Sequence, residues 1–315
     1  MPGISLGLQE RETRVSVRDN VLKRIESGIV IFDGAMGTQL QARGLPPGAC
    51  LEEWNVSHPE VVGAIHRAYF EAGSDVVLTN SFGGNRFLLE KYGHGDRVHE
   101  FNLTAARLAR EICPEGCFVG GSVGPTGEFI EPLGTRTYEG MRDAFSEQIA
   151  ALVEGGVDLI CIETMSDLQE VKAAIEAARE TSDLVVAATM AFDLGKKGFR
   201  TMMGVSPEKA ASLLEEAGTD IIGCNCGGID IEDMAELVKA FRQASTLPIL
   251  AQANAGVPRL VEGVTIHPQS PEDFAAGALP LIEAGANLIG GCCGTGPEHL
   301  RAMAEKVREY SSSKE

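Results

Sequence analysis

Two adjacent cysteines, Cys292 and Cys293, lie in the glycine-rich stretch LIGGCCGTGPEHL, directly after an apolar run. A third cysteine, Cys226, follows another apolar run in the stretch GCNC. Three thiolates that meet at one point suit zinc, a borderline-soft and usually four-coordinate ion. Because three protein ligands leave one position open, such a site would be catalytic rather than structural. The sequence therefore predicts a zinc site formed by Cys226, Cys292 and Cys293.

Cys292 and Cys293 are adjacent in the sequence, which restricts how both could bind the same ion. Neighbouring residues on a strand point to opposite faces, so both cysteines can reach one ion only where the backbone leaves the strand. Gly290, Gly291 and Gly294 permit such a departure. A disulfide between adjacent cysteines would be strained, and a phosphate-binding glycine loop would leave the thiols unexplained.

The other cysteines have simpler interpretations. Cys224 alternates with Cys226 and could replace it as a ligand, although Cys226 is favoured because it lies past the apolar run. The remaining four are interpreted as small buried hydrophobic residues, with a second metal pair of Cys113 and Cys117 as an alternative; they are Cys50, Cys113, Cys117 and Cys161.

Several polar residues also stand at the ends of apolar runs. Asp33 ends IVIFD and Glu163 ends DLICIE, where a buried carboxylate is costly unless it is paired. The partner would be a Lys, an Arg or the ammonium group of a ligand, although Asp33 could merely brace a turn. Thr79 and Asn80 stand at the end of the run DVVLT, and Asn254 follows the run PILAQ.

The elements that must position these residues are eight short apolar runs, each followed by a stretch with helical spacing. Such runs are typical of parallel strands buried on both faces. We expect them at 29–33, 75–79, 117–121, 158–163, 184–189, 220–224, 248–252 and 287–291.

Every second run begins with a related phrase, in which a glycine can end a helix and Asp or Asn opens the strand. The four phrases are EAGSDVV, EGGVDLI, EAGTDII and EAGANLI. Eight such units predict a single (β/α)8 TIM barrel in the α/β class over residues 29–315. Residues 1–28 would be an N-terminal helical extension, in which a helix in 19–28 closes the bottom of the barrel. A doubly wound open sheet is the rival, but no GxGxxG follows the first run.

In a barrel of this kind the carboxyl ends of the strands converge on one mouth, where the chemistry takes place. The cysteines and polar residues above are therefore expected to meet there. The net charge of −18 disfavours a nucleic acid or an anionic membrane as partner. The N-terminus shows neither a signal peptide nor a membrane anchor, so we expect a cytoplasmic protein.

The motifs resemble those of the homocysteine-binding zinc methyltransferase family, and most closely the N-terminal domain of cobalamin-dependent methionine synthase. The resemblance runs almost from end to end and rests on IFDGAMGTQL, TNSFGGNR, GPTGEFIEPLG, IETMSDLQE, GCNC, NAGVP and GGCCGTGPEHL.

This resemblance implies an S-methyltransferase that converts homocysteine to methionine, with Cys226, Cys292 and Cys293 as zinc ligands. Asp33 and Glu163 would hold the substrate amino group, and Asn254 would fill the open zinc position in the absence of substrate. The substrate carboxylate would be bound by the backbone of Ala35, Met36, Gly37 and Thr38. The substrate site would also include Thr79 and Asn80.

One departure from the family pattern follows the first zinc cysteine, where Ser-x-Gly-Pro is replaced by Gly227–Asp230 (GGID). This difference could change which methyl donor or which thiol acceptor the protein uses, but it leaves the three proposed zinc ligands in place. The expected donor is a methylated corrinoid, methylcobalamin or a corrinoid protein, which this chain does not bind tightly. A separate folate or cobalamin module would deliver it.

Three alternatives remain at this point. The donor could be a small onium compound such as betaine or S-methylmethionine, or the acceptor could be a different thiol. In the third alternative, the chain is a non-catalytic zinc or thiol-binding subunit of a methyl-transfer complex.

Overall fold

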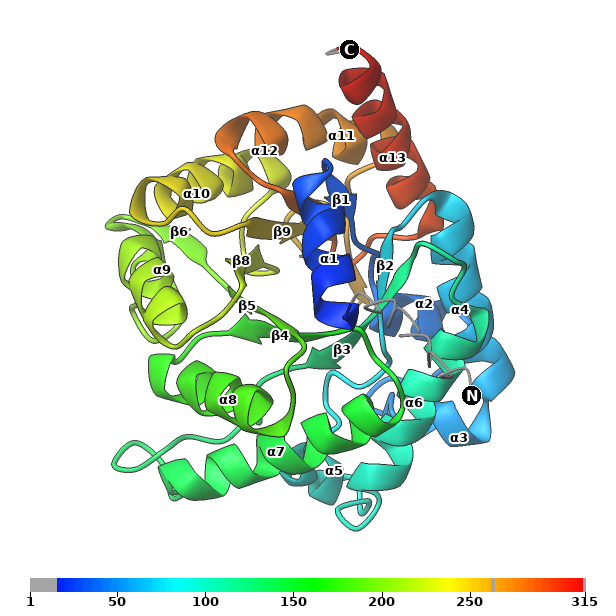
Figure 1. Cartoon of the computed structure of the whole chain (residues 1–315), viewed down its shortest axis with the longest axis vertical. Coiled ribbons are helices and arrows are strands. Elements are labelled where there is room, and N and C mark those ends of the chain that lie inside the picture. The colour runs from blue at the N-terminus through cyan, green and yellow to red at the C-terminus, as the bar shows by residue number, and fades with distance from the viewer. Residues whose placement is uncertain (1–15, 262–263, 314–315) are drawn as a thin grey trace, which may run out of the picture.

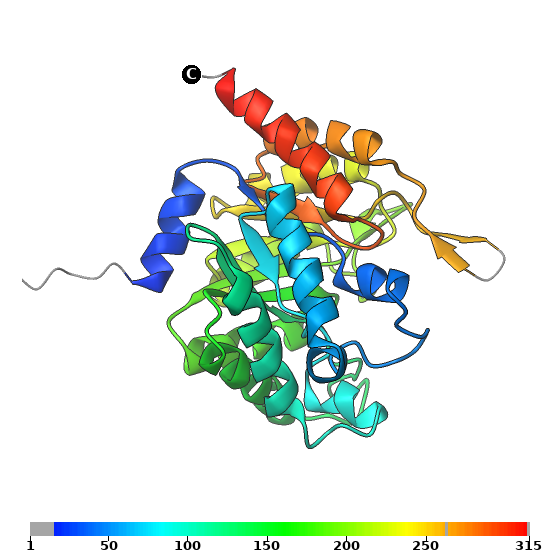
Figure 2. The same ribbon diagram turned by 90° about the vertical axis from the view of Figure 1, so that its right-hand side faces the viewer.

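In a computed structural model, which describes residues 16–261 and 264–313, eight parallel strands form one barrel surrounded by helices (Figures 1 and 2). The strand order is β1-β12-β9-β8-β5-β4-β3-β2, and a parallel bridge between Phe32 and Val76 joins the two outer strands. The barrel strands are β1 (Val30–Ile31), β2 (Val76–Leu78), β3 (Phe118–Val123), β4 (Leu159–Met165), β5 (Val185–Met190), β8 (Ile221–Asn225), β9 (Ile249–Ala253) and β12 (Leu288–Gly291).

Helices follow the strands and cover the outside of the barrel (Figure 1). They are α2 (Met36–Ala42), α3 (Trp54–Ser57), α4 (Pro59–Ala72), α5 (Arg86–Lys91), α6 (Val98–Ile112), α7 (Tyr138–Glu154), α8 (Leu168–Thr181), α9 (Pro207–Glu216), α10 (Ile231–Ala244), α11 (Pro271–Ala276), α12 (Ala278–Ala284) and α13 (Pro297–Ser312). One further helix, α1 (Val17–Glu26), precedes the first strand.

All eight predicted strands are confirmed, and with them the (β/α)8 barrel. The sequence analysis missed two antiparallel hairpins in the loops after β5 and β9. One pairs β6 (Asp193–Gly195) with β7 (Gly198–Arg200), and the other pairs β10 (Arg259–Val261) with β11 (Val264–Ile266). Both hairpins lie outside the barrel sheet. Their strands are not buried apolar runs, so the pattern used to predict the barrel strands could not detect them.

The four related phrases have a common structural role at the amino ends of alternate strands. Gly73 and Gly285 end their helices with φ of 106° and 110°, the left-handed conformation that favours glycine. The Asp or Asn that follows accepts a backbone N–H from the neighbouring strand and a guanidinium N–H from a helix. These pairs are Asp75 with Arg24, Asp158 with Arg110, Asp220 with Arg179, and Asn287 with Arg242.

The helix predicted within residues 19–28 is present as α1, which crosses the amino-terminal end of the barrel (Figure 1). Its Val21 and Ile25 pack into the apolar cluster inside the barrel, and its Arg18 pairs with Asp220. Residues 1–15 lie outside the described residues. The division of the chain into an extension of residues 1–28 and a barrel of residues 29–315 stays a prediction. Within the described part of the chain, every helix is too short or too polar to cross a bilayer.

Candidate metal and substrate site

Three cysteines from two separate loops meet at the carboxyl end of the barrel. Cys226 follows β8, whereas Cys292 and Cys293 follow β12, and β9 lies between these two strands. Their Sγ atoms all lie within 4.8 Å of one another, and those of Cys226 and Cys293 are 4.0 Å apart. Two sulfurs about 2.3 Å from a tetrahedral zinc ion would be roughly 3.8 Å apart, so the cluster fits zinc.

The backbone leaves both strands at these cysteines. Cys226 has a φ of 57° and Gly227 a φ of 76°, and a Cβ on Gly227 would lie only 2.1 Å from the carbonyl oxygen of Phe192. At the second loop Gly294 turns the chain with a φ of 81°. Gly290 and Gly291, by contrast, remain within β12. The backbone therefore turns away from the strand at Gly294, as predicted, and Gly290 and Gly291 take no part in this turn.

The loop that departs from the family pattern is held in place by its own contacts. The backbone N–H of Gly228 donates to Asp193 in β6 at 2.7 Å, and Asp230 caps α10 by accepting the N–H of Asp233. Ile229 is buried. The GGID sequence therefore builds an ordered connection from the cysteine to the next helix.

Asn254 connects the two cysteine loops. Its Nδ2 donates to the carbonyl of Gly227 at 2.9 Å, and its Oδ1 accepts the N–H of Cys293 at 3.1 Å. Asn254 does not line the cavity described below. The Asn254 side chain also hydrogen-bonds the Cys226 thiol and helps to lower its pKa. The expected role of Asn254 as an occupant of the open metal position stays a prediction.

The three sulfur atoms lie close enough to hydrogen-bond to one another. Hydrogen bonds from the Cys292 and Cys293 thiols hold the pKa of Cys226 far below its ordinary value, while the same contacts raise the pKa of Cys292. The cluster thus favours a thiolate even without metal. Burial instead raises the pKa of Cys224 to about 12, and this residue belongs to the apolar core. Cys226, and not Cys224, joins the cluster.

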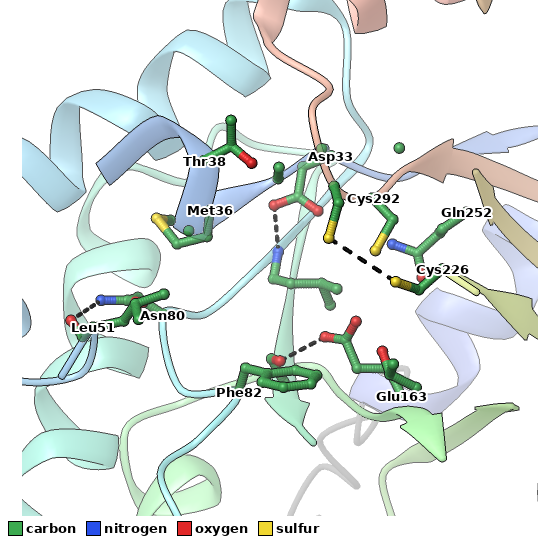
Figure 3. A pocket seen from close by; sticks show the side chains of 18 of the residues that line it. Asp33, Met36, Thr38, Leu51, Asn80, Phe82, Glu163, Cys226, Gln252 and Cys292 are labelled. Atoms are coloured by element: carbon green, nitrogen blue, oxygen red, sulfur yellow. Dashed lines mark hydrogen bonds between the residues drawn. The ribbon is translucent and has the colours of Figure 1, made fainter. Parts of the chain in front are cut away.

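A cavity of about 230 Å³ lies beside the sulfur atoms (Figure 3). Ligand pockets start at roughly 300 Å³, so this one suits a small metabolite. No Lys or Arg is among its lining residues, which are Asp33, Gly34, Ala35, Met36, Gly37, Thr38, Leu51, Leu78, Thr79, Asn80, Ser81, Phe82, Ser122, Glu163, Thr164, Cys226, Gln252, Gly291, Cys292 and Cys293.

Two buried carboxylates face this cavity without a cation (Figure 3). Asp33 accepts the N–H of Leu78 with Oδ2, while its buried Oδ1 has no hydrogen-bond partner among the residues that the structure describes. Glu163 accepts the hydroxyl of Ser122 at 2.6 Å. Burial raises the pKa of Glu163 to about 7 and raises that of Asp33 well above its ordinary value, with a further contribution from Glu163. The pair is suited to a ligand with a positive charge.

The remaining predicted residues line the same cavity, although some side chains are already engaged. The Thr79 hydroxyl contacts Ser81 and accepts the N–H of Ser122, and Asn80 donates to the carbonyl of Leu51. Thr79 and Asn80 therefore shape the wall. Residues Ala35–Thr38 line the cavity at the start of α2, where first-turn N–H groups lack intrahelical partners.

Sequence reasoning missed three polar residues of this region. Gln252 and Ser122 line the cavity, and Asn225 lies between Glu163 and Cys292. The Oε1 atom of Gln252 is buried and finds no hydrogen-bond partner within residues 16–261 and 264–313. A polar residue inside an otherwise apolar run, as in PILAQ, was the available signal for Gln252.

We expect Glu163→Gln to stabilise the ligand-free, metal-free protein in a pH-dependent way. Because the folded-state pKa of Glu163 is raised to about 7, the folded protein holds this proton more tightly than the unfolded chain. Its contribution to stability is therefore lost as pH rises from about 4.5 to about 7. At pH 8 the variant should gain on the order of 3 kcal/mol in free energy of unfolding, and almost none at pH 4. Urea titrations at the two pH values measure this, and an equal gain at both would contradict the shift.

Comparison with known sequences places the chain beside methyltransferases. A sequence model described as homocysteine S-methyltransferase matches residues 30–307. The chain is 34% identical to the methionine synthase of Mycobacterium tuberculosis (strain ATCC 25618 / H37Rv) over 305 residues, which cover 91% of this chain and 25% of that protein. The methionine synthase of Mycobacterium leprae (strain TN) is 33% identical with the same coverage. The chain thus spans about a quarter of the length of these relatives.

Solved structures share the barrel. The metallated form of the homocysteine methyltransferase MmuM from Escherichia coli has a TM-score of 0.76 and 23% identity, covering 91% of this chain and 99% of that one. Its oxidized form has a TM-score of 0.73 and 24% identity, covering 88% and 96%. At this level of identity, the structural likeness establishes the common fold.

Proposed function

We propose that this chain, which belongs to the homocysteine S-methyltransferase family, transfers a methyl group to the thiol of homocysteine and so forms methionine. One observation carries the proposal: a cluster of three sulfurs and two carboxylates without a cation face the same small cavity. A homocysteine molecule has a thiol at one end and an ammonium group at the other. A protein that merely stored metal would have no need for the carboxylates.

In this proposal Asp33 and Glu163 hold the substrate ammonium group between them. The N–H groups at the start of α2 bind the substrate carboxylate. Cys226, Cys292 and Cys293 would hold zinc, which when bound lowers the pKa of a substrate thiol so that it reacts as a thiolate.

The reaction is a direct displacement at the methyl carbon. The substrate sulfur forms a bond to that carbon, the bond between the methyl group and the donor breaks, and its electron pair leaves with the donor. The thiol proton is released to solvent. No covalent intermediate with the protein is required, so the protein contributes position, desolvation and charge.

The proposed donor is a methylated corrinoid, supplied as methylcobalamin or on a separate corrinoid protein or module. The similarity to one quarter of a methionine synthase supports this choice. Purified protein, zinc, homocysteine and methylcobalamin are expected to yield methionine, measured by chromatography of the product. Turnover with betaine or S-methylmethionine but not with methylcobalamin would contradict the proposed donor, and methylation of other thiols at equal rates would contradict the proposed acceptor.

A further inference from the structure

Asn225 is the last residue of β8 and directly precedes Cys226. Only 1% of it is exposed. Its Oδ1 accepts the backbone N–H of Thr164 at 2.8 Å and the hydroxyl of Thr189 at 2.7 Å. Its Nδ2 donates to the Thr164 hydroxyl at 2.7 Å, with longer contacts to Glu163 at 3.4 Å and to the Cys292 sulfur at 3.9 Å. One amide therefore joins three barrel strands.

Thr164 is strained in a way that this amide can hold. Its φ of 62° lies in the left-handed region, which is costly for a β-branched residue. The β4–β5 register shifts between Ile162 and Met165, so the strand bulges at this point. A bulge re-aims the side chains beside it, and Glu163 is its immediate neighbour. By binding both the N–H and the hydroxyl of Thr164, Asn225 holds the bulge that directs Glu163 into the cavity.

The same amide also faces the cysteine cluster. Glu163 is proposed to bind the substrate ammonium group, and Cys292 belongs to the cluster that is proposed to receive the thiol. Asn225 contacts both, and the chain connects it directly to Cys226. Asn225 therefore links the two ends of the cavity, while the hydroxyl of Ser122 also holds Glu163 at 2.6 Å.

We propose that Asn225 is a positioning residue that sets the spacing between the ammonium-binding and sulfur-binding ends of the cavity. In this role it selects a thiol that carries an amino group at the distance found in homocysteine. The inference rests on the proposed function. It adds a specificity determinant that touches neither the reacting atoms nor the substrate.

The variant Asn225→Asp tests this inference because it keeps the acceptor for Thr164 and Thr189 and removes the Nδ2 donor. Titrations of the zinc-loaded protein would use L-homocysteine and 4-mercaptobutyrate, which is homocysteine without the amino group. We expect zinc to remain stoichiometric and the dissociation constant for homocysteine to rise about tenfold or more, as for a lost hydrogen bond to a charged group. The value for 4-mercaptobutyrate should change less than about twofold.

Asn102→Asp is the matched control. Asn102 is also buried and donates Nδ2 to two carbonyls, those of Gly84 and Val98, outside the cavity lining. It should lower stability yet preserve the preference for homocysteine. Equal weakening of both ligands in Asn225→Asp, or unchanged homocysteine binding, would overturn the inference. If the wild-type protein binds zinc but does not prefer homocysteine to 4-mercaptobutyrate, the proposed substrate is contradicted. The inference about Asn225 is then contradicted as well.

A second variant tests the bulge even if Asn225→Asp folds poorly. Glycine adopts the Thr164 conformation without strain, so Thr164→Gly should restore homocysteine binding in an Asn225→Ala background. We expect the double variant to bind homocysteine at least about threefold more tightly than Asn225→Ala alone. The absence of any recovery would contradict the role assigned to the bulge.

Discussion

Replacing Cys292 with alanine is expected to abolish both zinc binding and methyl transfer. The side chain supplies one of the three sulfurs that lie within 4.8 Å of one another, and two thiolates alone do not complete a catalytic zinc site. Turnover should fall at least about a hundredfold, because a free thiol is only a few per cent thiolate near neutral pH and because the ion that would position it is lost. Metal analysis of the purified protein together with the rate of methionine formation measures both effects.

Cys224→Ala is the matched control for this experiment. Cys224 lies two residues before Cys226 and belongs to the apolar core rather than the cavity lining. The control should keep one zinc ion per chain and most of the activity. Stoichiometric zinc in Cys292→Ala would remove this residue from the ligand set, and loss of zinc from Cys224→Ala would reopen the choice between Cys224 and Cys226.

Asp33→Asn should weaken homocysteine binding on the order of ten- to a hundredfold, because a charged acceptor for the ammonium group is lost. The asparagine can still accept the N–H of Leu78, so the local backbone is expected to remain in place. Binding of 4-mercaptobutyrate should be almost unchanged. Calorimetric titration of the zinc-loaded variant with both ligands measures the difference.

The carboxylate pair also predicts a pH dependence. Because the pKa of Glu163 is raised to about 7, the carboxylate is largely neutral at pH 6 and largely charged at pH 8. The affinity for L-methionine, which has an ammonium group and no thiol, should therefore increase over this range. The increase should be smaller in Glu163→Gln, in which only Asp33, whose pKa is also raised, still titrates.

Glu170→Gln provides a control for these carboxylate substitutions. Glu170 is equally buried but accepts hydrogen bonds from Thr126, and it lies outside the cavity lining. Its substitution should leave ligand binding unchanged. An equal loss of homocysteine affinity in this control and in Asp33→Asn would indicate a general effect on folding instead of ammonium recognition.

The eight barrel strands were predictable because each is a short apolar run buried on both faces. The meeting of Cys226 with Cys292 and Cys293 followed from the barrel, since its topology brings the carboxyl ends of all strands to one mouth. The pattern of residue types was therefore sufficient to predict the order of the strands and to identify the loops that form the site.

Side-chain orientation could not be obtained in the same way. The hydrogen bonds of Asn254 to the backbone of Gly227 and Cys293 depend on the exact path of both cysteine loops. Asn225 appeared in the sequence only as the residue between two cysteines. Its contacts depend on the bulge at Thr164, which no local sequence signal announces.

X-ray absorption at the zinc edge examines whether three cysteines hold the ion with one position open to the substrate. In the zinc-loaded protein we expect three sulfur neighbours at about 2.3 Å and one lighter atom at about 2.0–2.1 Å. Addition of L-homocysteine should replace the lighter atom with a fourth sulfur. Fewer than three sulfurs before homocysteine is added, or an unchanged spectrum at saturating homocysteine, would contradict the proposed thiol activation.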